Sequence, residues 1–159
     1  MSTAAIVNPE KSKDIFTRAI RPLLTEADSY SSAGVKLIAF EYPYLDVELN
    51  WHQKNASIRL RVDGTDYSYR PVSGWWIDHA GHPLPPGHGA VPQGYGFHTQ
   101  LLTGENRCWF CFLGWREYHD HVSHQQVSWA ALRSQKRYSV IQLIVQLHQD
   151  LNRPEVTTI

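Results

Sequence analysis

Two cysteines three positions apart are the residues of this chain best suited to covalent chemistry. Cys108 and Cys111 lie in an apolar run that extends from residue 107 to residue 113. A thiolate is a nucleophile for acyl transfer and also a ligand for soft metals. A polar triplet, His98-Thr99-Gln100, lies upstream, and its histidine precedes Cys108 by ten residues. These residues define the first candidate site.

The same run also has a purely structural interpretation, in which it forms a buried strand. Cysteine is among the most buried residue types and packs like a small hydrophobic side chain. Strand alternation would place Cys108, Phe110 and Phe112 on one face, with Cys111 on the other. Under this interpretation neither thiol reacts.

A zinc site is a further alternative that uses the same cysteines. Cys108-x-x-Cys111 is followed by His119, His121 and His124, enough ligands for tetrahedral zinc. His119 and His121 would share a face of a strand and could then chelate. Glycine, which a metal knuckle needs between its cysteines, is missing here, and we expect a metal-free protein with two titratable thiols.

Acid–base chemistry near the thiols would fall to the segment that follows them. Glu117, His119 and Asp120 are candidates for removing a proton from an attacking amine, by their proximity in sequence alone. A nucleophilic dyad of Cys108 with His119 is also open, because a thiol and an imidazole suffice for such catalysis. No signature of a cysteine hydrolase family accompanies it.

The elements that must position these residues begin with a helix. Apolar residues recur at helical spacing from about residue 10 to residue 30, after a helix entry at Asn8-Pro9. Pro22 predicts a kink or two shorter helices, and residues 1–9 are expected to be flexible. Strands are predicted at 35–40, 44–49 and 58–62. The turn Asp63-Gly64 then predicts a returning strand at 67–69, which completes an antiparallel meander.

A long loop and a second helical region complete the predicted architecture. Prolines and glycines exclude regular structure for most of the stretch from residue 74 to residue 96. Two short strands are predicted at 97–102 and 107–113. A helical run that begins at Trp129 carries an apolar stripe and ends near Pro154. The predicted fold class is α+β in a single domain of residues 1–159.

Taken together, these features resemble the ubiquitin-conjugating (UBC-like) fold, most closely its divergent bacterial members. The resemblance covers residues 10–154 in outline and about 97–108 and 128–154 in motif. In that family a His-Pro-Asn triplet precedes the catalytic cysteine at the spacing of His98 to Cys108, whereas Thr99 and Gln100 replace its proline and asparagine here. The proline run 83–86 resembles the family's proline pair. Trp129 follows Cys108 by 21 residues, further than the one or two helical turns usual in the family.

The resemblance implies a carrier that accepts a ubiquitin-like protein as a cysteine thioester and passes it to an amine, without a cofactor. Cys108 would be the acceptor and Cys111 the reserve, Gln100 the oxyanion donor and His98 a loop-shaping residue. Partners implied are an activating enzyme, a ubiquitin-like protein or a defence nucleotidyltransferase, and a protein target, in bacterial antiphage defence. The alternative class is a catalytically inert interaction module of the same fold.

Bulk composition narrows the remaining classes. The chain has 159 residues, of which 42% are hydrophobic and 19% charged, as in a globular protein. Fifteen basic and fifteen acidic residues cancel, so no net charge favours nucleic acid or an anionic membrane. No apolar run approaches the roughly 18 residues that span a bilayer. With no secretory signal pattern, a cytoplasmic location with reduced thiols is expected.

Overall fold

A four-stranded antiparallel sheet forms the centre of the computed structural model, which describes residues 5–86, 91–124 and 126–158. Its order is β1-β2-β3-β4, and the strands are β1 (Val35–Glu41), β2 (Tyr44–Trp51), β3 (Ala56–Asp63) and β4 (Ser73–Ile77). A short 3₁₀ turn, η1 (His52–Lys54), joins β2 to β3. The first three predicted strands are therefore confirmed, and the α+β class with them.

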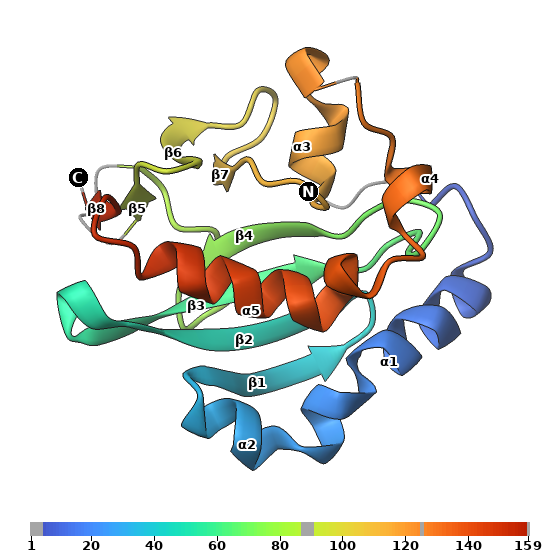
Figure 1. Cartoon of the computed structure of the whole chain (residues 1–159), viewed down its shortest axis with the longest axis horizontal. Helices are drawn as coiled ribbons and strands as arrows, with labels where there is room; N and C mark the ends of the chain where they lie inside the picture. Colours follow the sequence, from blue (N-terminus) through green and yellow to red (C-terminus); the bar gives the residue numbers. More distant parts are fainter. Residues whose placement is uncertain (1–4, 87–90, 125, 159) are drawn as a thin grey trace.

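The sheet buries one face because its sequence alternates. In β2, Leu45, Val47 and Leu49 are fully buried, whereas Asp46 and Glu48 between them form ion pairs with arginines of β3. Helix α5 (Val140–Leu151) crosses a face of the sheet (Figure 1). Its Ile144 and Leu147 join the same apolar core as the β2 side chains. Burial of these side chains is the main stabilising term of the fold.

The N-terminal helical region consists of two helices, but the first continues through Pro22 and the division lies at Glu26, so the predicted division at Pro22 is wrong. Helix α1 (Pro9–Thr25) is followed by α2 (Ala27–Ser32), both beyond the β1 edge of the sheet (Figure 1). The Asn8 side chain accepts hydrogen bonds from the first turn, which confirms the predicted helix entry. In the leader that is expected to be flexible, the N–H groups of Ile6 and Val7 donate to the Asp66 carboxylate, and the flexibility itself stays a prediction. Residues 1–4 of that leader lie outside the described residues.

The predicted returning strand at residues 67–69 is wrong. These residues form a turn, and the strand that pairs with β3 is β4, which includes Trp75 and Trp76. Asp63 accepts hydrogen bonds from the Thr65 N–H and hydroxyl, so the chain leaves the sheet there. Ser12 of α1 then donates to the Gly64 and Tyr67 carbonyls and holds the turn against the helix. The alternating tyrosines of residues 67–69 therefore belong to a loop and not to a strand.

A second, smaller β unit lies beyond the β4 edge of the sheet (Figure 1). Strands β6 (Phe97–Leu101) and β7 (Cys108–Phe110) pair as an antiparallel hairpin, as predicted, although β7 is shorter than expected. Helix α3 (Arg116–Asp120) and the 3₁₀ turn η2 (Val122–His124) follow it. The sequence pattern predicted no helix in this segment. Residues 87–90 of the long Pro/Gly loop lie outside the described residues.

The predicted continuous helical run from Trp129 is interrupted. Helix α4 (Trp129–Leu132) ends after one turn, and a 3₁₀ turn, η3 (Lys136–Tyr138), separates it from α5. The Ser139 side chain caps α5 by accepting from the Gln142 N–H, which marks a new helix start. The chain ends in β8 (Thr157–Thr158), paired with β5 (Pro92–Gln93). No helix among the described residues is both long and apolar enough to cross a membrane.

Candidate functional site

Cys108 begins β7 and points into the core. Its side chain is 1% exposed, and its thiol donates to the Thr99 carbonyl oxygen at 3.3 Å. Burial raises the pKa of the Cys108 thiol, because a thiolate would lose hydration there. At rest the thiol is therefore protonated and covered by the neighbouring strand.

Gln100 lies on an irregularity of β6 that faces this thiol. The register shifts between His98, which pairs with Trp109, and Leu101, which pairs with Cys108. The Thr99–Gln100 peptide occupies the shift, so its carbonyl contacts the sulfur while the Gln100 side chain is exposed. The hairpin carries His98, Gln100 and Cys108 on its two paired strands, with the Cys108 side chain buried and the Gln100 side chain exposed.

His98 lies on the outer face of the hairpin in a stack of rings. Trp109 lies between two imidazoles, with ring centroids 4.3 Å from His98 and 5.7 Å from His121. Burial lowers the pKa of His98, and the neighbouring His121 lowers it further. The stack fastens the hairpin to the segment after α3, so the position of His98 suits support of the hairpin.

Cys111 follows β7 and is half-buried. Burial raises the pKa of the Cys111 thiol, and the Glu117 carboxylate raises it further. Cys111 is better exposed than Cys108, but among the described residues no cation lowers the pKa of either thiol. Both cysteines are free thiols.

His119 uses both ring nitrogens on the backbone. Nε2 accepts from the Gly114 N–H at 3.1 Å, so Nδ1 carries the proton and donates to the Val127 carbonyl at 3.2 Å. Burial is the main cause that lowers the pKa of His119. This neutral ring ties the two ends of the α3 segment together. Its assignment as a base remains a prediction.

We expect stability to fall as pH drops below about 6.5, the ordinary pKa of histidine. Because the pKa of His119 is lowered in the folded state, the unfolded chain binds more protons in this range, and stability rises with pH. Urea unfolding at pH 5 and pH 7.5 measures the slope. His119→Ala should reduce the slope relative to wild type, whereas His82→Ala, whose side chain is 77% exposed, should not. Equal slopes in all three proteins would contradict the conclusion that the neutral His119 ring stabilises the fold through its two backbone hydrogen bonds.

The zinc alternative is not supported by the geometry. No three His, Cys, Asp or Glu side chains converge as a metal-binding group within residues 5–86, 91–124 and 126–158. The Cys108 side chain is buried against the core, whereas His121 lies in the surface stack on Trp109. His119 lies in a helix and not in the strand that chelation would need. The predicted five-ligand set is therefore not assembled.

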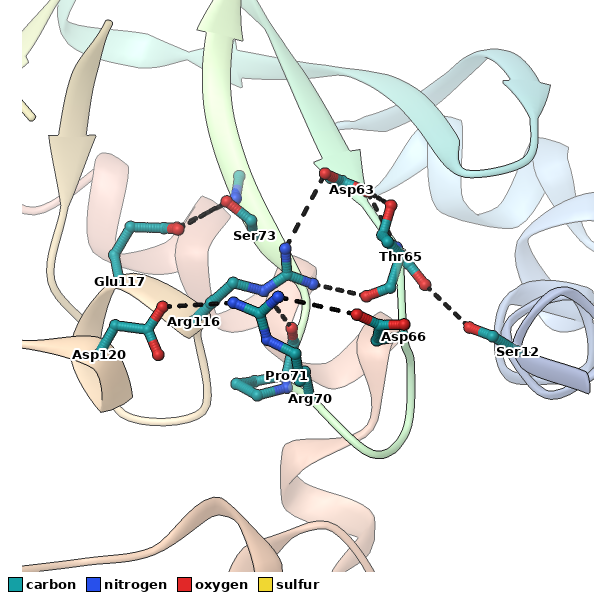
Figure 2. Close-up of polar contacts among 12 residues, drawn as sticks. Ser12, Asp63, Thr65, Asp66, Arg70, Pro71, Ser73, Arg116, Glu117 and Asp120 are labelled. Atoms are coloured by element: carbon teal, nitrogen blue, oxygen red, sulfur yellow. Dashed lines mark hydrogen bonds and ion pairs between the residues drawn. The ribbon is translucent and has the colours of Figure 1, made fainter. Parts of the chain in front are cut away.

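The polar network beside the hairpin was not predicted as a unit. Arg116 of α3 donates to the Pro71 carbonyl at 3.0 Å and to the Thr65 carbonyl at 2.6 Å, and lies 4.0 Å from the Asp63 carboxylate (Figure 2). Burial lowers the pKa of Arg116, and the neighbouring Asp63 opposes this effect. Arg116 thereby fixes the loop between β3 and β4.

Glu117 forms the other half of this network. Its two carboxylate oxygens accept from the Ser73 hydroxyl at 2.6 Å and the Gly74 N–H at 3.1 Å, and Arg107 lies 3.5 Å away. Burial raises the pKa of Glu117, while Arg107 opposes the rise. Sequence proximity had indicated Glu117 as an acid–base candidate. Its hydrogen bonds give it a positioning role between β4 and β7.

An open cleft of about 360 Å³ lies over this network. The β6–β7 turn, β4, α3 and η2 line it, with Trp75 and Leu102 as apolar walls. Three arginines contribute to the lining, namely Arg70, Arg107 and Arg116. Sequence gave no signal for this cleft beyond the Trp115-Arg116-Glu117 run, because its members come from four separate segments.

Trp115 was missed as a member of the site. It follows Cys108 by seven residues, is 1% exposed, and packs edge-on against Phe110 at 5.0 Å. Its ring also fills the space that a Cβ at Gly74 would need, at 2.7 Å.

Comparison with known proteins gives limited further information. No protein-family model matches the chain. It is similar to "Uncharacterized protein y4jH" of Sinorhizobium fredii, with 25% identity over 150 residues, covering 77% of this chain and 73% of that protein. The functional conclusion therefore rests on the site.

Proposed function

We propose that this chain is a carrier of the ubiquitin-conjugating type, which holds the C-terminal glycine of a ubiquitin-like protein as a thioester on Cys108. It would act in a bacterial defence system, in the reducing cytoplasm. Its partners would be an activating enzyme or defence nucleotidyltransferase, the ubiquitin-like protein, and a protein target with a free amine. The order of helix, antiparallel meander, loop, hairpin and final helix supports a UBC-like fold.

The observation that carries this proposal is the contact between Cys108 and the irregularity of β6. The thiol touches the Thr99 carbonyl, and the exposed Gln100 side chain begins in the very next residue. The nucleophile and the amide donor therefore lie on the paired strands of one hairpin, with the thiol buried and the Gln100 amide exposed. An amide N–H aimed at a developing oxyanion stabilises acyl transfer.

The proposed reaction has two balanced steps. The Cys108 sulfur, after losing its proton, attacks the activated carbonyl and a new C–S bond forms. The bond between that carbonyl carbon and the donor's leaving group breaks, and the leaving group takes up the proton. An amine then attacks this thioester, the C–S bond breaks, an amide forms, and the amine's lost proton returns to the Cys108 thiol. Because the resting thiol is covered, the β6–β7 hairpin must open before either step.

A peptide thioester tests the carrier without any activating enzyme. The native protein, incubated with a Gly-Gly-ended peptide carrying a mercaptoethanesulfonate leaving group, is expected to form a peptide adduct that thiol reductant removes. The adduct should form more slowly than on free cysteine, because burial protects Cys108. Absence of any reductant-labile adduct would contradict the carrier function.

A second function, an inert interaction module, is favoured by one specific observation. The Cys108 side chain is 1% exposed, and burial raises the pKa of its thiol, as in a structural cysteine. The module would bind its partner without forming a covalent bond. Failure of the thioester test in a folded protein would favour this second function.

A further inference from the structure

Arg70 is the least satisfied charged group in the cleft beside the hairpin. Its guanidinium makes no hydrogen bond to any described residue, although its side chain is only 20% exposed. Its nearest oxygens belong to Asp66 at 3.7 Å and Asp120 at 3.6 Å (Figure 2). Both distances exceed those of charge-assisted hydrogen bonds. A largely buried guanidinium with unused donors is costly, and an oxyanion would satisfy it.

The neighbouring arginine adds positive potential at the same place. The guanidiniums of Arg70 and Arg116 lie side by side (Figure 2), and Arg70 contributes to lowering the pKa of Arg116. Arg116 already binds two carbonyls. Arg70 is therefore the group with donors to spare.

Most carboxylates of the cleft are occupied by internal partners and do not compete for Arg70. Asp63 accepts from Thr65, Glu117 accepts from β4, and Glu105 pairs with Arg107. Asp66 accepts two N–H groups through one oxygen, while its other oxygen has no hydrogen bond and lies 3.7 Å from Arg70 as a buried counter-ion that stays in place. Asp120 is different, because its side chain is 62% exposed and forms a long ion pair with Arg70. Asp120 is thus the carboxylate that a bound ligand can displace from Arg70.

We propose that this cleft binds an oxyanion attached to an apolar body, with Arg70 as the anchor and Asp120 as the internal group that the ligand displaces. The anion would take up the unused Arg70 donors in a bidentate contact. Trp75, Leu102 and Val122 line the cleft and supply apolar contact for the rest of the ligand. A volume of about 360 Å³ suits one amino-acid-sized group. The site does not depend on the thiols.

Two probes that share a phenyl ring distinguish the two sources of an oxyanion. N-acetylphenylalanine offers a carboxylate, phenyl phosphate offers a phosphate, and N-acetylphenylalanine amide is the uncharged control. We expect saturable calorimetric binding of at least one acid, with a shift of the Arg70 Nε–Hε resonance, and none for the amide. The tighter acid identifies the preferred oxyanion. No saturable binding of either acid up to about 10 mM would overturn the proposal.

Variants of the two opposing groups give shifts in opposite directions. Arg70→Gln should weaken binding at least about tenfold, as for loss of a charged hydrogen bond. Asp120→Asn should tighten it about fivefold, because it removes the competing charge from an exposed position. Arg18→Gln and Asp14→Asn, an exposed pair on α1, are matched controls and should change nothing. Asp120 is exposed, so Asp120→Asn need not affect folding. Unchanged binding in this variant would overturn the proposal that the ligand displaces Asp120 from Arg70.

Discussion

Replacing Arg116 with methionine is expected to lower the free energy of unfolding by about 3–5 kcal/mol, the usual cost of removing one partner from a buried ion pair. The side chain is 5% exposed and lies among Asp63, Thr65 and Pro71. Methionine would leave the Asp63 carboxylate without its cation and two carbonyls without donors. The loss should therefore exceed that of an ordinary core truncation of similar volume.

Urea unfolding measures this effect. The urea midpoint should fall. The slope of the unfolding free energy against urea concentration should stay constant, because the variant and the wild type expose similar amounts of surface on unfolding. Arg116→Lys keeps the positive charge but loses the planar guanidinium with its several N–H donors, so we expect an intermediate loss of unfolding free energy. Arg133→Met, at an exposed position, is the control and should change stability little. A loss below about 1 kcal/mol in Arg116→Met would show that the network contributes no more than a surface pair.

Replacing Gln100 with alanine is expected to slow discharge of the thioester to lysine by about 100-fold, as for loss of one oxyanion donor. Loading should change little, because the donor acts on the step with amine attack. Gln100 is exposed and so is free to turn toward the thioester once the hairpin has opened. Single-turnover discharge of pre-loaded protein measures the rate.

Two further variants make this test specific. Gln100→Asn restores the shorter amide of the family triplet, so it should discharge at least as fast as wild type. Gln126→Ala removes another exposed amide and should not alter the rate. Equal discharge by wild type and Gln100→Ala would remove Gln100 from the mechanism and leave a backbone N–H as the donor.

The parts of the fold with regular apolar periodicity could be predicted from sequence. Helix α1 and strands β1, β2 and β3 each bury one face, so their patterns have the period of the element. The β6–β7 hairpin was predicted because Thr103-Gly104-Glu105-Asn106 separates two short segments that could form strands. These elements bring His98, Gln100 and Cys108 to one hairpin.

The remaining elements depend on contacts between distant residues, and such contacts leave no local pattern. Helix α3 is short and polar outside, and its place is fixed by Arg116 reaching Thr65, 51 residues away. The turn at 67–69 has the aromatic alternation of a strand, but Ser12 of α1 holds it as a loop. The run after Trp129 has helical periodicity throughout, yet the Ser139 cap starts a separate helix. Burial of Cys108 was foreseen by the strand interpretation, whereas its hydrogen bond to Thr99 was not.

Comparison of the two cysteine variants tests the proposed carrier most directly. Native Cys108→Ala and Cys111→Ala proteins are incubated with the Gly-Gly peptide thioester, and intact mass before and after reductant gives the amount of thioester on each. Circular dichroism establishes that both variants are folded. A carrier that uses Cys108 predicts a normal adduct on Cys111→Ala and none on Cys108→Ala. An adduct that persists on Cys108→Ala and disappears on Cys111→Ala would contradict the assignment of Cys108.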